Sequence, residues 1–355
     1  MTGSNDSIET SDPGQLTADP LVSVLMITYN HATYLAQAIE GVLRQECDFA
    51  FELIIGEDAS PDGALAIALE YQRRFPKIVR VIHSPSNVGM KANGRRIHER
   101  ARGEFIAYCE GDDYWCRVDK LASQVALMRS DASVGIVHTD WVRSKYIAGA
   151  WRCDAGRSVH HRVPSHLLLG DLSRTWHFPK VLRTCTVMLR RDTVQRLIES
   201  DIAKREYRFG DSVQNAFVAL QWQVGYVPAV TAVYRVSPNS ALRSGAGARV
   251  EFYRSCLQFD TDARTFFAEL VRYGDGFRWE AGMGLLVWSL RARDGKSALE
   301  AASDLYRHFG VLRSIGLGLR AIAMRIPTLR RQPRRAPELA RFGPGDDNAS
   351  FFGPP

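Results

Sequence analysis

The chain has 355 residues, of which 45% are hydrophobic and 24% are charged. These proportions are typical of a soluble globular protein, most simply one large domain with an appendage. The formal net charge of +7 favours anionic partners, although it does not choose among nucleotides, nucleic acids and membrane surfaces. No apolar run approaches the roughly 20 residues that a membrane-spanning helix needs, which argues against such a helix.

Cysteine usage and the N-terminal residues bear on the compartment. The six cysteines contain no Cys-x-x-Cys pair, and Cys109 falls within an expected core strand, so we expect reduced thiols. The first residues lack the charged and apolar regions of a signal peptide. These features predict a cytoplasmic protein.

Strands and helices are predicted to alternate along the first half of the chain. Residues 1–19 are polar and aperiodic, and we expect them to be disordered. An apolar run over residues 21–27 predicts a strand, and helical spacing of apolar residues over 32–43 predicts a helix. Further strands are predicted over residues 51–56, 78–82, 105–109 and 134–138, and further helices over 64–75, 90–102 and 118–128. This alternation predicts an α/β fold with an open, mostly parallel sheet flanked by helices, which binds ligands at the carboxyl ends of its strands.

Two adjacent carboxylates follow one of the predicted strands. Gly111 breaks the strand at residues 105–109 and is followed directly by Asp112 and Asp113. Adjacent anions repel each other, so a site that keeps both ionised needs a cation such as Mg²⁺ or Mn²⁺, bound together with the phosphates of a ligand. The alternative is a surface turn, because Gly-Asp-Asp is also ordinary turn composition.

No phosphate-binding glycine loop accompanies the aspartate pair. The chain has no Gly-x-x-x-x-Gly-Lys-Ser/Thr sequence, and the turn after the first strand, residues 28–31, contains no glycine. A nucleotide bound here would therefore need its phosphates neutralised in another way, which a metal on the carboxylates would provide.

Several stretches, taken in order and spacing, resemble the family 2 glycosyltransferases of GT-A fold, over roughly residues 20–240. The matching stretches are Val22–Asn30, Glu57–Ser60, Asn87–Gly89, Ala101–Ile106 with the aspartate pair, Arg183–Arg191, Phe209–Asp211, Val224–Pro228 and Val233–Val236. The resemblance implies an inverting hexosyltransferase that moves a sugar from a nucleoside diphosphate sugar, with a UDP-sugar favoured. The implied acceptor is a hydroxyl of a glycan or lipid-linked glycan, in the synthesis of a cell-surface polysaccharide.

The resemblance also assigns roles to five residues. It implies that Tyr29 lies beside the uracil, that Asp58 hydrogen-bonds the base, and that Asp112 faces the ribose and the metal. Asp113 would be the main ligand of the divalent metal, and Asp211 would be the catalytic base, which removes the proton of the attacking hydroxyl. One position departs from the family: several relatives carry a histidine after Tyr-Arg-x, where this chain has a serine at position 237. The sequence therefore leaves open whether the metal is coordinated from that side.

Each assignment has a structural alternative. Asp211 precedes a predicted helix and would serve equally as its N-cap. Asp58 would close an Asx turn before Pro61, and Tyr29 would be a half-buried aromatic at a strand end.

The C-terminal third changes character. After a predicted catalytic domain over residues 20–240, we expect a helical extension over 241–332 and a disordered tail over 333–355. Within the extension, an i, i+3, i+7 apolar stripe accompanied by arginines predicts a basic amphipathic helix near residues 312–326. This helix would lie either on the anionic inner face of the plasma membrane or against the catalytic domain.

Three rival functions fit the sequence less well than a glycosyltransferase does. A nucleotidyltransferase would show a glycine-rich basic loop after the first strand. A non-catalytic nucleotide-sugar-binding or scaffold subunit would not need Asp211 in addition to Asp112 and Asp113. Nucleic-acid binding is not predicted, because no recognition motif accompanies the arginine clusters.

Overall fold

The computed structural model describes residues 7–153, 158, 160, 163–172, 182–219, 221–236, 245–268 and 275–323, with the backbone alone for 166, 212 and 311–323. The strands are β1 (Ile8–Thr10), β2 (Val22–Thr28), β3 (Phe51–Glu57), β4 (Val79–His83), β5 (Phe105–Tyr108), β6 (Tyr114–Trp115), β7 (Val134–Ile147), β8 (Ala150–Cys153), β9 (Met188–Arg190) and β10 (Gln223–Val236). The α-helices are α1 (Ala32–Leu43), α2 (Ala64–Arg74), α3 (Met90–His98), α4 (Lys120–Ser130), α5 (Arg191–Glu199), α6 (Asp211–Ala219), α7 (Ala246–Phe266), α8 (Gly276–Ala292) and α9 (Gly295–Ala323).

The described strands form one mixed sheet in the order β1-β4-β3-β2-β5-β9-β7-β10-β6, with β8 paired to β7. Strands β4, β3, β2 and β5 run parallel, as the alternation of strands and helices predicted. Strand β9 runs antiparallel between β5 and β7, and β6 runs antiparallel to β10 at the edge. In the second half β7 and β10 pair in parallel, while β9 and β6 are antiparallel to their neighbours. The predicted open, mostly parallel sheet is therefore confirmed.

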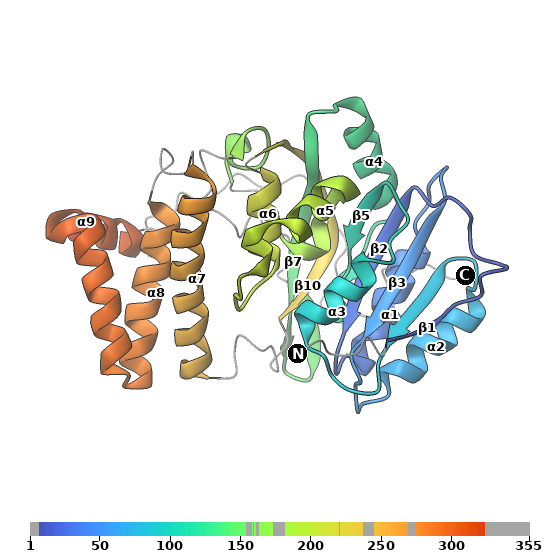
Figure 1. Cartoon of the computed structure of the whole chain (residues 1–355), viewed down its shortest axis with the longest axis horizontal. Helices are drawn as coiled ribbons and strands as arrows, with labels where there is room; N and C mark the ends of the chain where they lie inside the picture. Colours follow the sequence, from blue (N-terminus) through green and yellow to red (C-terminus); the bar gives the residue numbers. More distant parts are fainter. Residues whose placement is uncertain are drawn as a thin grey trace.

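Helices cover both faces of the sheet, because residues of the central strands alternate between two apolar cores. In β2, Leu25 belongs to the core beneath α3, α5 and α6, whereas Val24 and Met26 belong to the core beneath α1, α2 and α4. The C-terminal helices α7 and α8 join the first of these cores through Phe259 and Phe277. In Figure 1 they stand beside α6, on the side of the molecule away from β1. The expected helices at the C-terminal end are thus present, and α7 and α8 pack against the α/β domain.

One strand is longer than predicted. The sequence predicted a strand over residues 134–138, but β7 continues to Ile147. Its middle contains the polar residues His138, Thr139 and Asp140, which ended the apolar pattern. They remain in the strand because β10 pairs with β7 from Val134 to Lys145.

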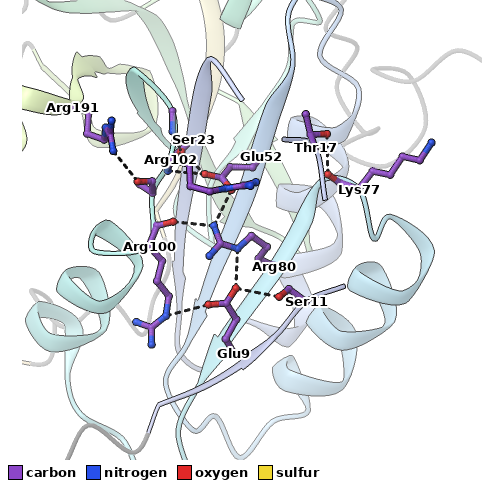
Figure 2. Close-up of polar contacts among 12 residues, drawn as sticks. Glu9, Ser11, Thr17, Ser23, Glu52, Lys77, Arg80, Arg100, Arg102 and Arg191 are labelled. Carbon is purple, nitrogen blue, oxygen red and sulfur yellow. Dashed lines mark hydrogen bonds and ion pairs between the residues drawn. The ribbon is translucent and has the colours of Figure 1, made fainter. Parts of the chain in front are cut away.

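The prediction of disorder over residues 1–19 is wrong from residue 7 onward. Strand β1 pairs antiparallel with β4 at the edge of the sheet, and Glu9 forms ion pairs with Arg80 at 2.9 Å and Arg100 at 3.3 Å. Thr17 further donates its backbone N–H to the Lys77 carbonyl at 3.1 Å. Figure 2 shows Glu9 between the two arginines. A polar segment with little apolar surface is ordered here because its carboxylate meets two cations of the folded domain.

Arg80 also contacts the buried carboxylate of Glu52, at the amino end of the sheet. Glu52 has no exposed surface, and it accepts hydrogen bonds from Ser23 Oγ at 2.6 Å, Arg80 Nη1 at 2.8 Å and Arg102 Nε at 2.9 Å (Figure 2). Burial alone would raise the pKa of Glu52, but these hydrogen bonds outweigh it and hold the pKa below its usual value. The network ties β2, β3 and β4 to the segment before β5.

Other predictions for the C-terminal end lie partly outside the described residues. None of the described helices is long and apolar enough to cross a membrane. The backbone of α9 breaks from helical geometry at Gly310, where φ is 64° and ψ is 173°. The predicted amphipathic helix therefore begins after this break, while the tail over 333–355 lies outside the described residues.

Candidate active site

The carboxyl ends of three neighbouring strands place four of the predicted site residues along one edge of the sheet. Strand β2 lies between β3 and β5, so the residues that follow these strands meet. Tyr29 follows β2 and is 44% exposed, Asp58 follows β3, and Asp112 and Asp113 follow β5. Tyr29 is thus available to a ligand at this edge.

Asp58 anchors the loop that precedes α3. Its side chain is buried, and its two oxygens accept the backbone N–H groups of Val88 at 2.8 Å and Gly89 at 2.9 Å. The predicted alternative, an Asx turn closed by Asp58, is wrong, because Glu57 accepts the N–H groups of Ala59 and Ser60 instead. Each Asp58 oxygen can accept a second hydrogen bond, so contact with a base remains a prediction.

Asp113 is held by the backbone of a distant strand. The carboxylate is 1% exposed, and Oδ1 accepts the backbone N–H of Arg235 at 2.8 Å. This contact forms because β6 pairs with β10, with Tyr114 opposite Val233. The other oxygen, Oδ2, is buried and makes no hydrogen bond among the described residues. Asp113 therefore presents one oxygen that needs a partner.

Asp112 is the more accessible member of the pair. Its side chain is 27% exposed, and Oδ2 lies 3.9 Å from His31 Nε2. Its backbone carbonyl accepts a hydrogen bond from Arg235 Nη1 at 2.9 Å. Arg235 thus fixes the turn of both aspartates, through its backbone N–H and its guanidinium.

Burial and like charge raise the pKa values of the acids in this turn. Burial, reinforced by the charge of Asp112, raises the pKa of Asp113 to about 8, against the lowering effect of the Arg235 N–H, the Cys185 thiol and Arg183. Burial and the neighbouring acids likewise hold the pKa of Glu110 well above its usual value. Both groups favour the protonated state unless a cation is bound beside them.

Glu110 was not among the residues predicted from the sequence. It begins the turn that carries the aspartate pair, because its carbonyl accepts the backbone N–H of Asp113 at 3.0 Å, and its place next to that pair was a signal available in the sequence. The three acids that raise the pKa of Glu110 are Asp113, Asp112 and Asp211. We call these four residues, Glu110, Asp112, Asp113 and Asp211, the carboxylate cluster.

Asp211 reaches the cluster from another element. It is the first residue of α6, where the helix dipole stabilises a carboxylate. A role in starting the helix would therefore be enough to explain an acid at this position. The charge of Asp211 also raises the pKa of Glu110, an effect that a residue serving only to begin the helix would not need to have. One turn later, Gln214 accepts a hydrogen bond from Tyr108 of β5 at 2.7 Å, which ties the start of α6 to the strand that delivers the aspartate pair.

The segment before Asp211 is held by the C-terminal extension. Tyr207 donates its hydroxyl to Asp262 of α7 at 2.8 Å, and the Arg208 N–H donates to Ser255 at 2.9 Å. Phe209 packs edge-on against Phe259 with 5.6 Å between ring centroids. Helix α7 therefore supports the approach to α6 as part of the site.

The protein supplies few ligands for a metal. Among the described residues, no three His, Cys, Asp or Glu side chains come together in a way that could hold a metal ion. Mg²⁺ and Mn²⁺ in phosphate-binding sites need no such cage, because one or two carboxylates suffice when substrate phosphates and water complete the shell. The free Oδ2 of Asp113 and the raised pKa values of the turn fit a cation of that kind.

Comparisons with known proteins agree with this architecture. Residues 23–193 match the model of glycosyl transferase family 2. An uncharacterised protein of Mycobacterium tuberculosis is 41% identical over 104 residues, which cover 29% of this chain and 30% of that protein. TuaG of Bacillus subtilis, provisionally named a teichuronic acid biosynthesis glycosyltransferase, is 33% identical over 109 residues, covering 31% of this chain and 42% of TuaG. The chain thus matches less than half the length of these relatives.

Two solved structures share the fold. The mannosyltransferase PcManGT of Pyrobaculum calidifontis, in complex with GDP-Man and Mn²⁺, superposes with a TM-score of 0.51 at 19% identity, covering 87% of this chain and 81% of PcManGT. Residues 1–349 of TarS of S. aureus, in complex with UDP-GlcNAc, superpose with a TM-score of 0.50 at 14% identity, covering 81% of this chain and 91% of TarS 1–349. These two structures share the α/β fold of this chain. Residues 23–193 of this chain form a domain of glycosyl transferase family 2.

Proposed function

We propose that the chain is an inverting glycosyltransferase that moves a sugar from a nucleoside diphosphate sugar, a UDP-sugar in the first instance, to a hydroxyl of a glycan or lipid-linked glycan. The observation that carries the proposal is the carboxylate cluster, in which β5 and α6 contribute acids to one site at the carboxyl edge of the sheet. The nucleotide sugars bound by PcManGT and TarS, and the provisional assignment of TuaG, support the substrate class and a role in cell-surface polysaccharide synthesis.

The acids of the cluster have separate tasks in this proposal. Asp211 accepts the proton of the acceptor hydroxyl. At the same time the hydroxyl oxygen forms a bond to the anomeric carbon, and the bond from that carbon to the diphosphate breaks. General-base help of this kind is worth roughly 10²–10⁴ in rate. A single displacement places the attacking and leaving oxygens on opposite faces of the sugar, so the configuration at the anomeric carbon is inverted.

The donor would lie along the strand ends. Tyr29 would stack beside the base and Asp58 would accept a hydrogen bond from it, while Asp112 would face the ribose. Asp113 and Asp112 would hold Mg²⁺ or Mn²⁺ between the protein and the diphosphate, and Mn²⁺ in PcManGT supports this assignment. When bound, the cation supplies Lewis-acid stabilisation of the leaving group.

Release of nucleoside diphosphate tests the proposal. A panel of UDP- and GDP-sugars is incubated with the protein and Mn²⁺, with water as the slow acceptor, and Asp211→Asn is compared with Asp201→Asn. Asp201 is an exposed acid that pairs with Lys204 at 2.6 Å and lies outside the cluster. We expect Asp211→Asn to lose about two to four orders of magnitude in turnover with unchanged donor binding, and Asp201→Asn to keep its rate. Release that is equally fast in both variants would refute the role of Asp211.

We also propose that the protein works in the cytoplasm, at the inner face of the plasma membrane. The support is the basic amphipathic pattern after Gly310, since each Lys or Arg near an anionic surface contributes about 1 kcal/mol. A flotation assay with anionic vesicles compares the intact chain with one that ends at Phe309. We expect binding to be lost on truncation, and equal flotation of the two proteins would refute the proposal.

A further inference from the structure

Arg183 occupies a defined position beside the carboxylate cluster. Its carbonyl accepts the backbone N–H of Thr186 at 2.8 Å and the Thr186 hydroxyl at 2.7 Å, which fixes the backbone from which the side chain extends. The guanidinium carbon lies 4.9 Å from the ring centroid of Trp141 and 4.4 Å from that of Tyr234. These two rings meet at 78°, so the guanidinium sits in the corner between them.

One donor of this guanidinium is left for a ligand. Arg183 Nε is buried and has no hydrogen-bond partner among the described residues. An unsatisfied buried donor costs about 1–3 kcal/mol in stability. The contacts with the two rings hold the Arg183 side chain in this position, and a ligand oxygen would satisfy Nε. Arginine stacked on aromatic rings keeps its N–H edge available for a bidentate anion.

The guanidinium faces the acids that handle the diphosphate. Tyr234, against which it packs, directly precedes Arg235, whose N–H binds Asp113. The charge of Arg183 lowers the pKa of both Glu110 and Asp113, against the burial that raises it. Arg183 is therefore close enough to act electrostatically on the metal-binding turn.

The second arginine at this edge is already engaged. Arg235 donates Nη1 to the Asp112 carbonyl and Nη2 to Gln37, and its guanidinium carbon lies 4.5 Å from the ring centroid of Tyr114. Arg235 thus holds the turn in place, and two of its guanidinium nitrogens already donate within the protein. Arg183 instead combines a permanent charge with an open donor.

A bound diphosphate and the ionised carboxylates of the cluster together carry more negative charge than one divalent cation offsets. A guanidinium can supply the missing charge without a change of protonation. We propose that Arg183 binds the diphosphate of the donor and stabilises it as it leaves. The proposal rests on the proposed function, because it names a further catalytic residue for the same transfer.

The test compares Arg183→Gln and Arg183→Lys with Arg143→Gln. Arg143 is a matched control, since its guanidinium carbon lies 5.5 Å from the ring centroid of the same Trp141 but its side chain is exposed. With Mn²⁺ present, calorimetry measures the affinity for UDP and GDP, and saturation-transfer NMR measures binding of the corresponding nucleoside. Thermal unfolding verifies that each variant is folded.

We expect Arg183→Gln to weaken nucleoside diphosphate binding at least tenfold while nucleoside binding is unchanged. The affinity of Arg183→Lys for nucleoside diphosphate should lie between those of Arg183→Gln and the wild type, and that of Arg143→Gln should be within twofold of the wild type. Equal weakening of nucleoside and nucleoside diphosphate would mean that Arg183 only supports the fold, and unchanged affinity for both would mean that it does not touch the diphosphate; either result overturns the inference alone. A wild type that binds neither UDP nor GDP overturns the proposed function and this inference together.

Discussion

The backbone N–H of Arg235 donates to Asp113 Oδ1 at 2.8 Å, although 122 residues separate the two in the chain. The contact forms because the pairing of β10 with β6 brings the C-terminal end of β10 against the turn after β5. It satisfies one oxygen of a buried carboxylate, and we propose that the other oxygen binds a cation.

The first prediction concerns Asp113 in the absence of metal. Between about pH 4, where an unfolded aspartate titrates, and about pH 8, the folded protein binds a proton that the unfolded chain has lost. The free energy of unfolding should therefore fall as pH rises through this window, by up to about 1.4 kcal/mol per pH unit. Asp113→Asn is neutral throughout and can still accept the Arg235 N–H, so its stability should equal that of the wild type near pH 4 and exceed it at pH 8. Thermal unfolding with a chelator checks this, and parallel pH profiles of the two proteins would contradict it.

The second prediction concerns Glu52, at the opposite end of the sheet from the site. Its carboxylate holds Arg80 and Arg102 in a buried network, and removing one partner of such a network leaves uncompensated buried charge. Glu52→Ala should lower the free energy of unfolding by about 3–5 kcal/mol. Glu99→Ala, which removes an exposed pair with Arg95, should cost less than about 1 kcal/mol. Denaturant unfolding measures both, and similar losses in the two variants would show that the network contributes no more than a surface pair.

The third prediction concerns acid stability. His138 has no exposed surface, and burial, together with the nearby His160, lowers its pKa to about 3. An unfolded histidine binds a proton below about pH 6.5, so stability should be lost as pH falls from there towards 3, by about 1.4 kcal/mol per pH unit. His138→Gln should flatten this part of the profile. The exposed His308 provides the control, and an equally steep acid loss in His138→Gln and His308→Gln would count against the buried histidine as its source.

The fourth prediction concerns the support that α7 gives to Asp211, the proposed catalytic base. Tyr207→Phe removes the hydroxyl that donates to Asp262 and keeps the ring. We expect a loss of about 1 kcal/mol in stability and a several-fold lower turnover with unchanged affinity for nucleoside diphosphate, because the segment before Asp211 loosens. Tyr306→Phe, at an exposed position of α9, should change neither quantity. A drop in affinity equal to the drop in turnover would show that the contact supports the whole site.

Local patterns sufficed to predict the strand ends that carry Tyr29, Asp58 and the aspartate pair, because each follows directly on an apolar strand and parallel strands align their carboxyl ends. Arg183 and Arg235 could not be predicted in this way. Their place in the site depends on β10 lying beside β6 and on Tyr234 packing against Arg183, which are pairings between distant segments. The error over residues 1–19 has the same cause, since Glu9 is held by arginines about 70 and 90 positions further along the chain.

The central claim is that the carboxylate cluster binds a nucleoside diphosphate through a divalent cation. A thermal-shift panel of UDP and GDP, with and without Mn²⁺, tests it on the wild type, on Asp113→Ala and on Asp119→Ala, which removes an exposed acid paired with Arg117. A ligand at 100 times its dissociation constant stabilises by about 2.7 kcal/mol, which this assay resolves. We predict a shift that requires Mn²⁺, persists in Asp119→Ala and disappears in Asp113→Ala. A wild type that responds to neither nucleotide, or an Asp113→Ala variant that responds as the wild type does, would contradict the account.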